Sequence, residues 1–192
     1  MAMNEELSGY LGQIEAVKRE GNAILAGATD VQFNWRPGPE RWSMAQCFDH
    51  LNVAMRRTFP AFDRAIADAR DRGLRAPGPF RYGWFSRWMV GSMEPPVKRR
   101  QRTFKIFVPA QEAPLAATLA EFRTVRDQLA DRVRTADGLD LKRQRVISPV
   151  CRLLRLPLGA YFAFVIAHDR RHLWQARNVR AAPEFPGGPR VH

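Results

Sequence analysis

Cysteine is scarce in this sequence. The 192 residues include only two, Cys47 and Cys151. Two cysteines are too few for a disulfide framework or for a structural zinc site built from thiolates. We therefore expect reduced thiols in a reducing compartment, with Cys47 as a small buried residue.

Long apolar runs are also missing. The longest, roughly residues 153–167, is interrupted by Arg155 and Pro157 and is too short to span a bilayer. The first residues, MAMNEELSGY, are acidic and polar, so no signal peptide is expected. The sequence thus predicts a cytoplasmic protein without a membrane partner.

Acidic residues are outnumbered, 19 against 31 Lys and Arg, which gives a net charge of +12. Such a charge can attract nucleic acid, anionic lipid or acidic substrates. The basic residues are spread along the chain, however, and no nucleic-acid recognition motif accompanies them. We expect no nucleic-acid partner, although the densest run, VKRRQRTFK at 97–105, could form an anion patch.

Four segments show the apolar spacing of amphipathic helices, and no alternating pattern is long enough to indicate a sheet. The segments are residues 4–27, 43–72, 112–136 and 158–181. Ser43 and Gln46 form a capping-box pattern that places the start of the second helix. Pro60 predicts a kink or break near Thr58–Phe59. The expected fold is all-α, a four-helix bundle.

The connections divide the chain further. Residues 73–111 join the second and third helices and contain five prolines, so we expect a long irregular excursion with one short helix in YGWFSRWMVGSME. It could be a surface cover, a lid or an oligomer contact; a membrane-interface helix is less favoured because the stretch is short. Residues 139–157 look irregular. The predicted domain spans 1–182, followed by a Pro/Gly-rich tail at 183–192.

Three histidines lie on predicted inner helix faces. His168 and His172 are four residues apart, so they share a face, which Tyr161 and Phe164 continue as an apolar stripe. His50 lies on a largely apolar face of the second helix. Imidazoles from two helices can converge in a bundle core, and three protein ligands leave one coordination position open, as in catalytic metal sites.

A simpler interpretation remains open, in which these histidines are core or surface residues and their spacing is coincidental. Gln46 and Gln175 could orient ligands or water around a metal, or cap a helix and face solvent. Arg171 could hold an anionic substrate or be a solvated charge. His192, the last residue, is not expected to take part.

Two stretches resemble the DinB-like four-helix bundles: WRPGPERWSMAQCFDHL at 35–51 and PLGAYFAFVIAHDRRHLWQARNV at 157–179. The matching pattern is a Trp and Pro loop, then Trp-Ser, then a helix with one His, and later His-x-x-x-His followed by Gln. The Phe-Val-Pro segment at 107–109 also agrees.

The resemblance implies an up-down-down-up bundle with one divalent metal, such as Zn, Ni, Fe or Mn, held by His50, His168 and His172. It also implies a homodimer, and either hydrolysis or thiol S-transfer with a low-molecular-weight thiol such as bacillithiol, mycothiol or glutathione. The leading hypothesis is therefore a metal-dependent enzyme acting on a small molecule. The alternative is a non-catalytic, stress-linked bundle that binds a metal or a ligand.

Overall fold

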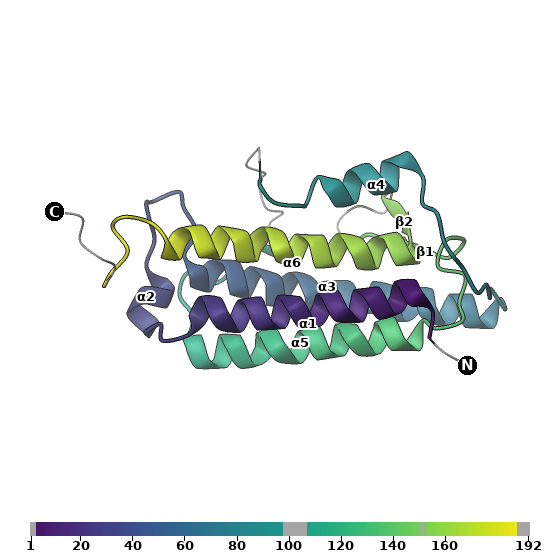
Figure 1. The fold of residues 1–192 in the computed structure, drawn as a ribbon, viewed down its shortest axis with the longest axis horizontal. Helices are drawn as coiled ribbons and strands as arrows, with labels where there is room; N and C mark the ends of the chain where they lie inside the picture. The colour runs from purple at the N-terminus through teal and green to yellow at the C-terminus, as the bar shows by residue number, and fades with distance from the viewer. Residues whose placement is uncertain (1–2, 98–106, 150, 152, 188–192) are drawn as a thin grey trace.

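The four predicted helices are present. The computed structural model describes residues 3–97, 107–149, 151 and 153–187. The bundle consists of α1 (Glu5–Leu25), α3 (Met44–Asp71), α5 (Leu115–Thr135) and α6 (Leu158–Arg180), and the connections carry two short helices, α2 (Asp30–Asn34) and α4 (Trp84–Gly91) (Figure 1). None of the described helices is long and apolar enough to cross a membrane.

Helices α3 and α5 run in the same direction. Asn52 bonds to the Thr118 carbonyl, and further along both helices Arg70 bonds to the Thr135 carbonyl. Parallel neighbours need a connection that returns over the whole length of the first helix. The 28 residues of α3 span about 42 Å, which explains why the link between α3 and α5 must be long.

Helices α1 and α6 form the other parallel pair. Arg170 bonds to Gln13, and further along both helices Arg180 bonds to the Ile24 carbonyl. Figure 1 shows α1 and α6 running opposite to α3 and α5. The order is therefore up-down-down-up, as expected.

The N-terminus of α3 is set by its sequence. Ser43 and Gln46 form the predicted capping box, each side chain bonding to the other residue's backbone N–H. A kink or break was expected near Thr58–Phe59, and the break is absent, because α3 continues through Pro60. Proline costs a helix interior about 3 kcal/mol or more, and the burial of Phe59 and Phe62 beside it offsets that cost.

Two elements were not predicted. The loop after α1 contains α2, which begins with a second capping box formed by Thr29 and Gln32. The segment at 139–157 contains an antiparallel ribbon of β1 (Arg145–Ile147) and β2 (Arg155–Pro157). Strands of three residues are too short to show an alternating pattern, so the sequence did not reveal them.

The excursion between α3 and α5 is tied to the bundle on both sides of α4. Before α4, the Tyr82 hydroxyl donates to Glu6 over 2.7 Å. A Cβ at position 159 would clash with that hydroxyl, so Gly159 permits the approach. After α4, Glu94 pairs with Arg170 of α6. The short helix expected in this segment is confirmed, and it contacts α6.

The predicted tail begins against the bundle. Phe185 is buried and meets the Trp35 ring edge-on at a centroid distance of 5.6 Å. Gln32 also donates to the Pro186 carbonyl. The remaining tail residues, 188–192, lie outside the described part of the chain.

Candidate metal centre

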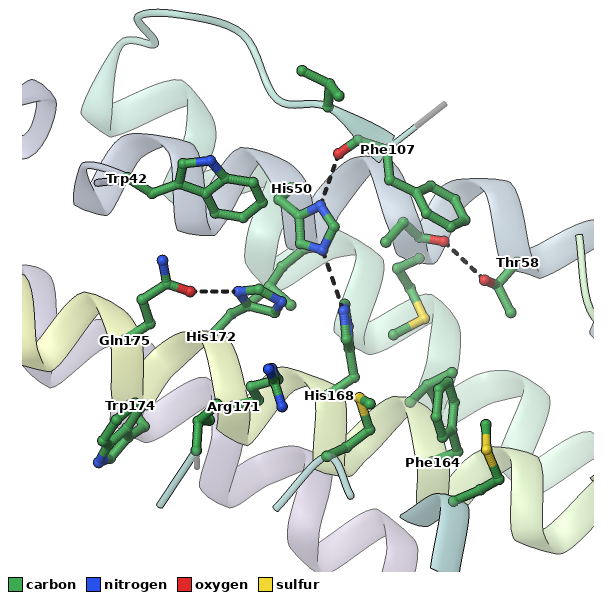
Figure 2. A pocket seen from close by; sticks show the side chains of 18 of the residues that line it. Trp42, His50, Thr58, Phe107, Phe164, His168, Arg171, His172, Trp174 and Gln175 are labelled. Carbon is green, nitrogen blue, oxygen red and sulfur yellow. Dashed lines mark hydrogen bonds between the residues drawn. The ribbon is translucent and has the colours of Figure 1, made fainter. Parts of the chain in front are cut away.

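The three histidines predicted as a group converge in the structure. His50 comes from α3, and His168 and His172 come from successive turns of α6 (Figure 2). One ring nitrogen from each can be chosen so that all three lie within 4.8 Å of one another. The ring centroids are 4.5 to 5.1 Å apart. Packing of α3 against α6 thus brings His50 and His168, which are 118 residues apart in the sequence, into contact.

Two of the rings are oriented by partners at their Nδ1 atoms. His50 Nδ1 lies 2.8 Å from the Phe107 carbonyl oxygen, and His172 Nδ1 lies 3.1 Å from Gln175 Oε1. Both partners are hydrogen-bond acceptors, so each Nδ1 carries the proton. In a neutral imidazole that tautomer leaves Nε2 as a lone-pair donor. Metal-binding histidines are commonly oriented in this way.

The spacing of two of the nitrogens fits a shared ion. His50 Nε2 and His168 Nε2 are 3.2 Å apart. Two imidazoles on one tetrahedral zinc at 2.0–2.1 Å would place their nitrogens about 3.3 Å apart. Three neutral nitrogen donors with two outer hydrogen bonds are therefore a suitable donor set for a divalent transition metal.

Burial keeps these imidazoles uncharged. It lowers the pKa of His50, and it lowers the pKa values of His168 and His172 well below the usual value near 6.5. The positive charges of Arg126 and Arg171 further lower the pKa of His168. Only a neutral imidazole can donate a lone pair to a metal, so the protein environment favours the binding form at neutral pH.

Trp42 covers the cluster on one side. Its ring is nearly parallel to that of His172, at a centroid distance of 5.6 Å, and lies 5.0 Å from the ring of His50. The sequence pattern included Trp42 in the matching Trp-Ser pair, but its contact with the histidines was not predicted. An indole in this position restricts how both rings can turn and excludes water from that side.

The histidines form part of the wall of a cavity of about 940 Å³. That volume lies within the range of small-molecule sites. Most of the wall is apolar, including Met89 and Met93 from the excursion and Phe107 and Phe164. The excursion therefore forms part of the cavity wall rather than merely covering one end of the core.

The other predicted site residues lie as follows. Gln175 orients His172, whereas the Gln46 side chain bonds to the backbone N–H of Ser43 in the capping box. Cys47 is fully buried, and burial raises the pKa of its thiol, in agreement with a core role. Arg171 lines the cavity and donates to the Ser92 carbonyl.

Two other predictions fall outside the described residues. These are the exclusion of His192 from the site and the anion patch at 97–105, of which only residue 97 is described.

A polar cluster that the sequence did not reveal lies behind the histidines. Arg126 of α5 and Asp169 of α6 are fully buried and form an ion pair at 2.6 Å. Asp169 stands in the charged run DRR, which resembles a solvated helix face. Only the assembled bundle, in which Arg126 of α5 reaches α6 across the core, shows that Asp169 points inward.

Comparison with known proteins identifies the family. The DinB superfamily model matches residues 13–176. The chain belongs to the DinB superfamily. No match was found among curated proteins.

One solved structure shares the fold of this DinB-superfamily chain. It is YfiT from Bacillus subtilis, described as "a probable metal-dependent hydrolase with an unusual four-helix bundle topology". The likeness covers 94% of this chain and 89% of that one, with a TM-score of 0.62 and 14% sequence identity. At this identity the match supports the bundle fold alone.

Proposed function

We propose that this DinB-superfamily protein is a metal-dependent enzyme that acts on a small molecule, with His50, His168 and His172 as the ligands of one divalent metal. The observation that carries the proposal is the convergence of three neutral imidazoles at the wall of a large apolar cavity. Hydrolysis is the favoured reaction, and the description of YfiT, which shares the fold, supports it.

His50, His168 and His172 would hold the metal with one coordination position open, and the metal would supply a lowered pKa for a water or thiol there. The residues of the chain prepare the site. The Phe107 carbonyl and the Gln175 amide hold two Nε2 atoms toward the centre, and Trp42 shields the rings from solvent. The apolar wall would hold the apolar part of a substrate.

No protein side chain is assigned as a general base. Among the described residues that line the cavity, Glu40 is the one carboxylate, and it is exposed. The proposed reaction therefore depends on the metal for activation of the nucleophile. Arg171, which lies beside His172 on α6 and lines the cavity, is a candidate to attract an anionic group of the substrate.

Thiol S-transfer is the second candidate reaction. The volume of about 940 Å³ is close to the upper end for small-molecule sites, which leaves room for a thiol and an electrophile together. The cosubstrate would be a low-molecular-weight thiol. The homodimer implied by the family resemblance stays a prediction.

The test is turnover by the metal-loaded protein. The apo-protein is loaded in turn with Zn, Ni, Fe(II) and Mn, then assayed with ester and amide libraries and with electrophiles in the presence of bacillithiol, mycothiol or glutathione. We expect turnover that disappears in His172→Ala and persists in His192→Ala, which removes an imidazole at the last residue. Metal binding with neither water- nor thiol-dependent turnover would favour a non-catalytic binding protein.

A further inference from the structure

The outer side of α4 carries three exposed aromatic rings. Trp84 is 73% exposed, Trp88 is 59% and Phe85 is 42%, and each tryptophan ring lies 6.0 Å from that of Phe85. Ser86 is buried, so α4 has a distinct inner side. Large aromatic side chains grouped on a surface mark an interaction site more often than a single exposed apolar residue does.

The β1–β2 ribbon extends this surface. Figure 1 shows the ribbon beside α4, outside the four long helices. A depression joins the two elements, lined by Trp84 and Phe85 together with Lys142, Arg145 and Arg155. We call these five residues and Trp88 the aromatic-basic surface.

Aliphatic side chains accompany the basic ones on the ribbon. Ile147 pairs across the strands with Arg155, so the two side chains lie on the same side. Ile147 is 40% exposed, and Leu153, which precedes β2, is 92% exposed. The surface therefore combines aromatic, aliphatic and cationic groups.

The charges of this surface are not neutralised. Lys142, Arg145 and Arg155 are exposed, and no ion pair involves them among the residues that the structure describes. Asp140, whose carboxylate accepts the backbone N–H groups of Lys142 and Arg143, lies nearby and offsets one of the three positive charges. By contrast, Lys18 on α1 pairs with Asp127. The aromatic-basic surface thus presents excess positive charge.

We propose that the aromatic-basic surface binds the surface of an anionic lipid bilayer. Tryptophan favours the boundary between water and acyl chains, where its ring is buried and its N–H stays wet. Basic side chains nearby gain about 1 kcal/mol each from anionic headgroups. The aromatic and aliphatic groups would enter the headgroup region while the cations meet lipid phosphates.

Two other occupants fit less well. A second copy of the chain, joined about a two-fold axis, would bring the same unpaired cations face to face. Single-stranded nucleic acid could stack on the tryptophans, but Ile147 and Leu153 offer it no flat ring. The expectation of no membrane partner rested on the lack of a spanning run, and a surface contact needs no such run.

The position of α4 relates this surface to the cavity. Met89 of α4 and Met93 just after it line the cavity, whereas Trp84 and Trp88 face away. The ties of Tyr82 to Glu6 and of Glu94 to Arg170 hold α4 on the bundle. A bilayer bound to the outer side of α4 would therefore lie across that helix from the histidines.

The test is flotation of the full chain with lipid vesicles. Phosphatidylglycerol–phosphatidylcholine vesicles are compared with pure phosphatidylcholine vesicles, and single-stranded DNA serves as a second polyanion. We expect the wild type to float with the anionic vesicles and to show a blue shift of tryptophan emission. Lipids brominated near the headgroup should quench that emission in the wild type, a readout that needs no variant.

Variants locate the contact. Trp84→Ser with Trp88→Ser should weaken vesicle binding at least about tenfold, since two interfacial rings are lost. Arg145→Glu with Arg155→Glu should weaken it about thirtyfold or more. The control, Arg57→Glu with Arg64→Glu, makes the same charge change at exposed positions of α3 and should weaken it by no more than about threefold. Circular dichroism checks that each variant is folded.

Several results would overturn the proposal. They are failure of the wild type to bind anionic vesicles, an equal loss of vesicle binding in the control and ribbon variants, and binding of DNA without binding of vesicles. A change from dimer to monomer in the tryptophan variant, with vesicle binding unchanged, would assign the surface to self-association instead.

Discussion

Two polar clusters are buried in the same bundle, and they begin at adjacent residues of α6. His168 points toward α3 and the cavity, where it meets His50. Asp169 points toward α5, where it meets Arg126. One cluster is neutral and borders a cavity, whereas the other is charged and has no access to solvent.

Each side-chain nitrogen and oxygen of the ion pair has a hydrogen-bond partner inside the protein. Arg126 donates from Nη2 and Nε to the two oxygens of Asp169, over 2.6 and 3.3 Å, and from Nη1 to Asn52 Oδ1 over 3.0 Å. Asn52 in turn donates to the Thr118 carbonyl over 3.1 Å. Such a network joins three helices and pairs both charges within the protein, so its role is structural.

The histidine cluster, by contrast, has nitrogens that converge at a cavity instead of pairing opposite charges within the core. Two of its outer nitrogens, Nδ1 of His50 and Nδ1 of His172, are bonded to Phe107 and Gln175, and its inner nitrogens face one another at the cavity wall. Three neutral nitrogen donors gathered within 4.8 Å stabilise the protein poorly but can bind a cation well. The comparison suggests a general criterion: a buried polar cluster whose inward-facing donors converge at a cavity is a candidate site.

The largest expected effect on stability comes from breaking the buried Arg126–Asp169 ion pair. Asp169→Ala leaves a buried guanidinium without its counter-ion and should lower the free energy of unfolding by about 3–5 kcal/mol. Denaturant titration of the metal-free protein measures it. The double variant Arg126→Met with Asp169→Leu should recover most of the loss, because two apolar side chains replace both charges. A single-variant cost below about 1 kcal/mol would contradict the structural role.

The histidine cluster should instead make stability depend on pH. The pKa values of His50, His168 and His172 are lowered in the folded state, so the unfolded chain binds more protons below the unfolded pKa near 6.5. Stability of the metal-free protein should be flat above about pH 6.5 and fall as pH decreases from there. Each histidine contributes up to about 1.4 kcal/mol per pH unit.

The control for this pH dependence is His168→Ala, which should show a shallower slope between about pH 6.5 and 5. Asp169 acts in the opposite direction, since burial raises its pKa and the folded state takes up its proton first. It is present in both proteins, so the difference in slope belongs to His168. Identical slopes would show that this imidazole is not held neutral by burial.

Substitutions of the two glutamines Gln46 and Gln175 should have smaller effects, which differ between the two residues. Gln175→Leu removes the acceptor for His172 Nδ1–H and should weaken metal binding about 10–100-fold with little change in stability. Gln46→Leu removes one partner of the capping box and should lower stability by about 1 kcal/mol while metal affinity stays close to wild type. Competition with a chelating dye measures affinity, and an equal loss of affinity in both would contradict the assignment.

Local patterns in the sequence predicted the helices and the shared face of His168 and His172, whereas the metal-ligand set with His50 came from the family resemblance. The Ser43 capping box and the four-residue spacing of His168 and His172 depend on neighbours within one turn, which a sequence displays directly. The hydrogen bond of His50 does not depend on such neighbours. Its acceptor, the Phe107 carbonyl, is 57 residues away, on a connection that must return along the bundle. The pattern of side chains in a sequence does not predict which backbone carbonyl will accept a hydrogen bond.

The dependence on distant residues also explains the other differences between the sequence-based predictions and the structure. Asp169 lies in a run of charges, and its buried partner on α5 becomes visible only when the rotation of both helices is known. Pro60 suggested a kink or break because the local cost of proline was apparent, whereas the burial of Phe59 and Phe62 that offsets this cost was not. The β1–β2 ribbon was too short to produce a signal.

The most direct test of the central claim is the metal content of untagged, freshly purified protein, wild type beside His50→Ala, by elemental mass spectrometry. The site predicts about one transition-metal ion per chain in the wild type and near-complete loss in the variant, with the fold retained by circular dichroism. A wild type that holds no metal and takes up none on reconstitution, or a variant that keeps the same stoichiometry, would contradict the three-histidine site.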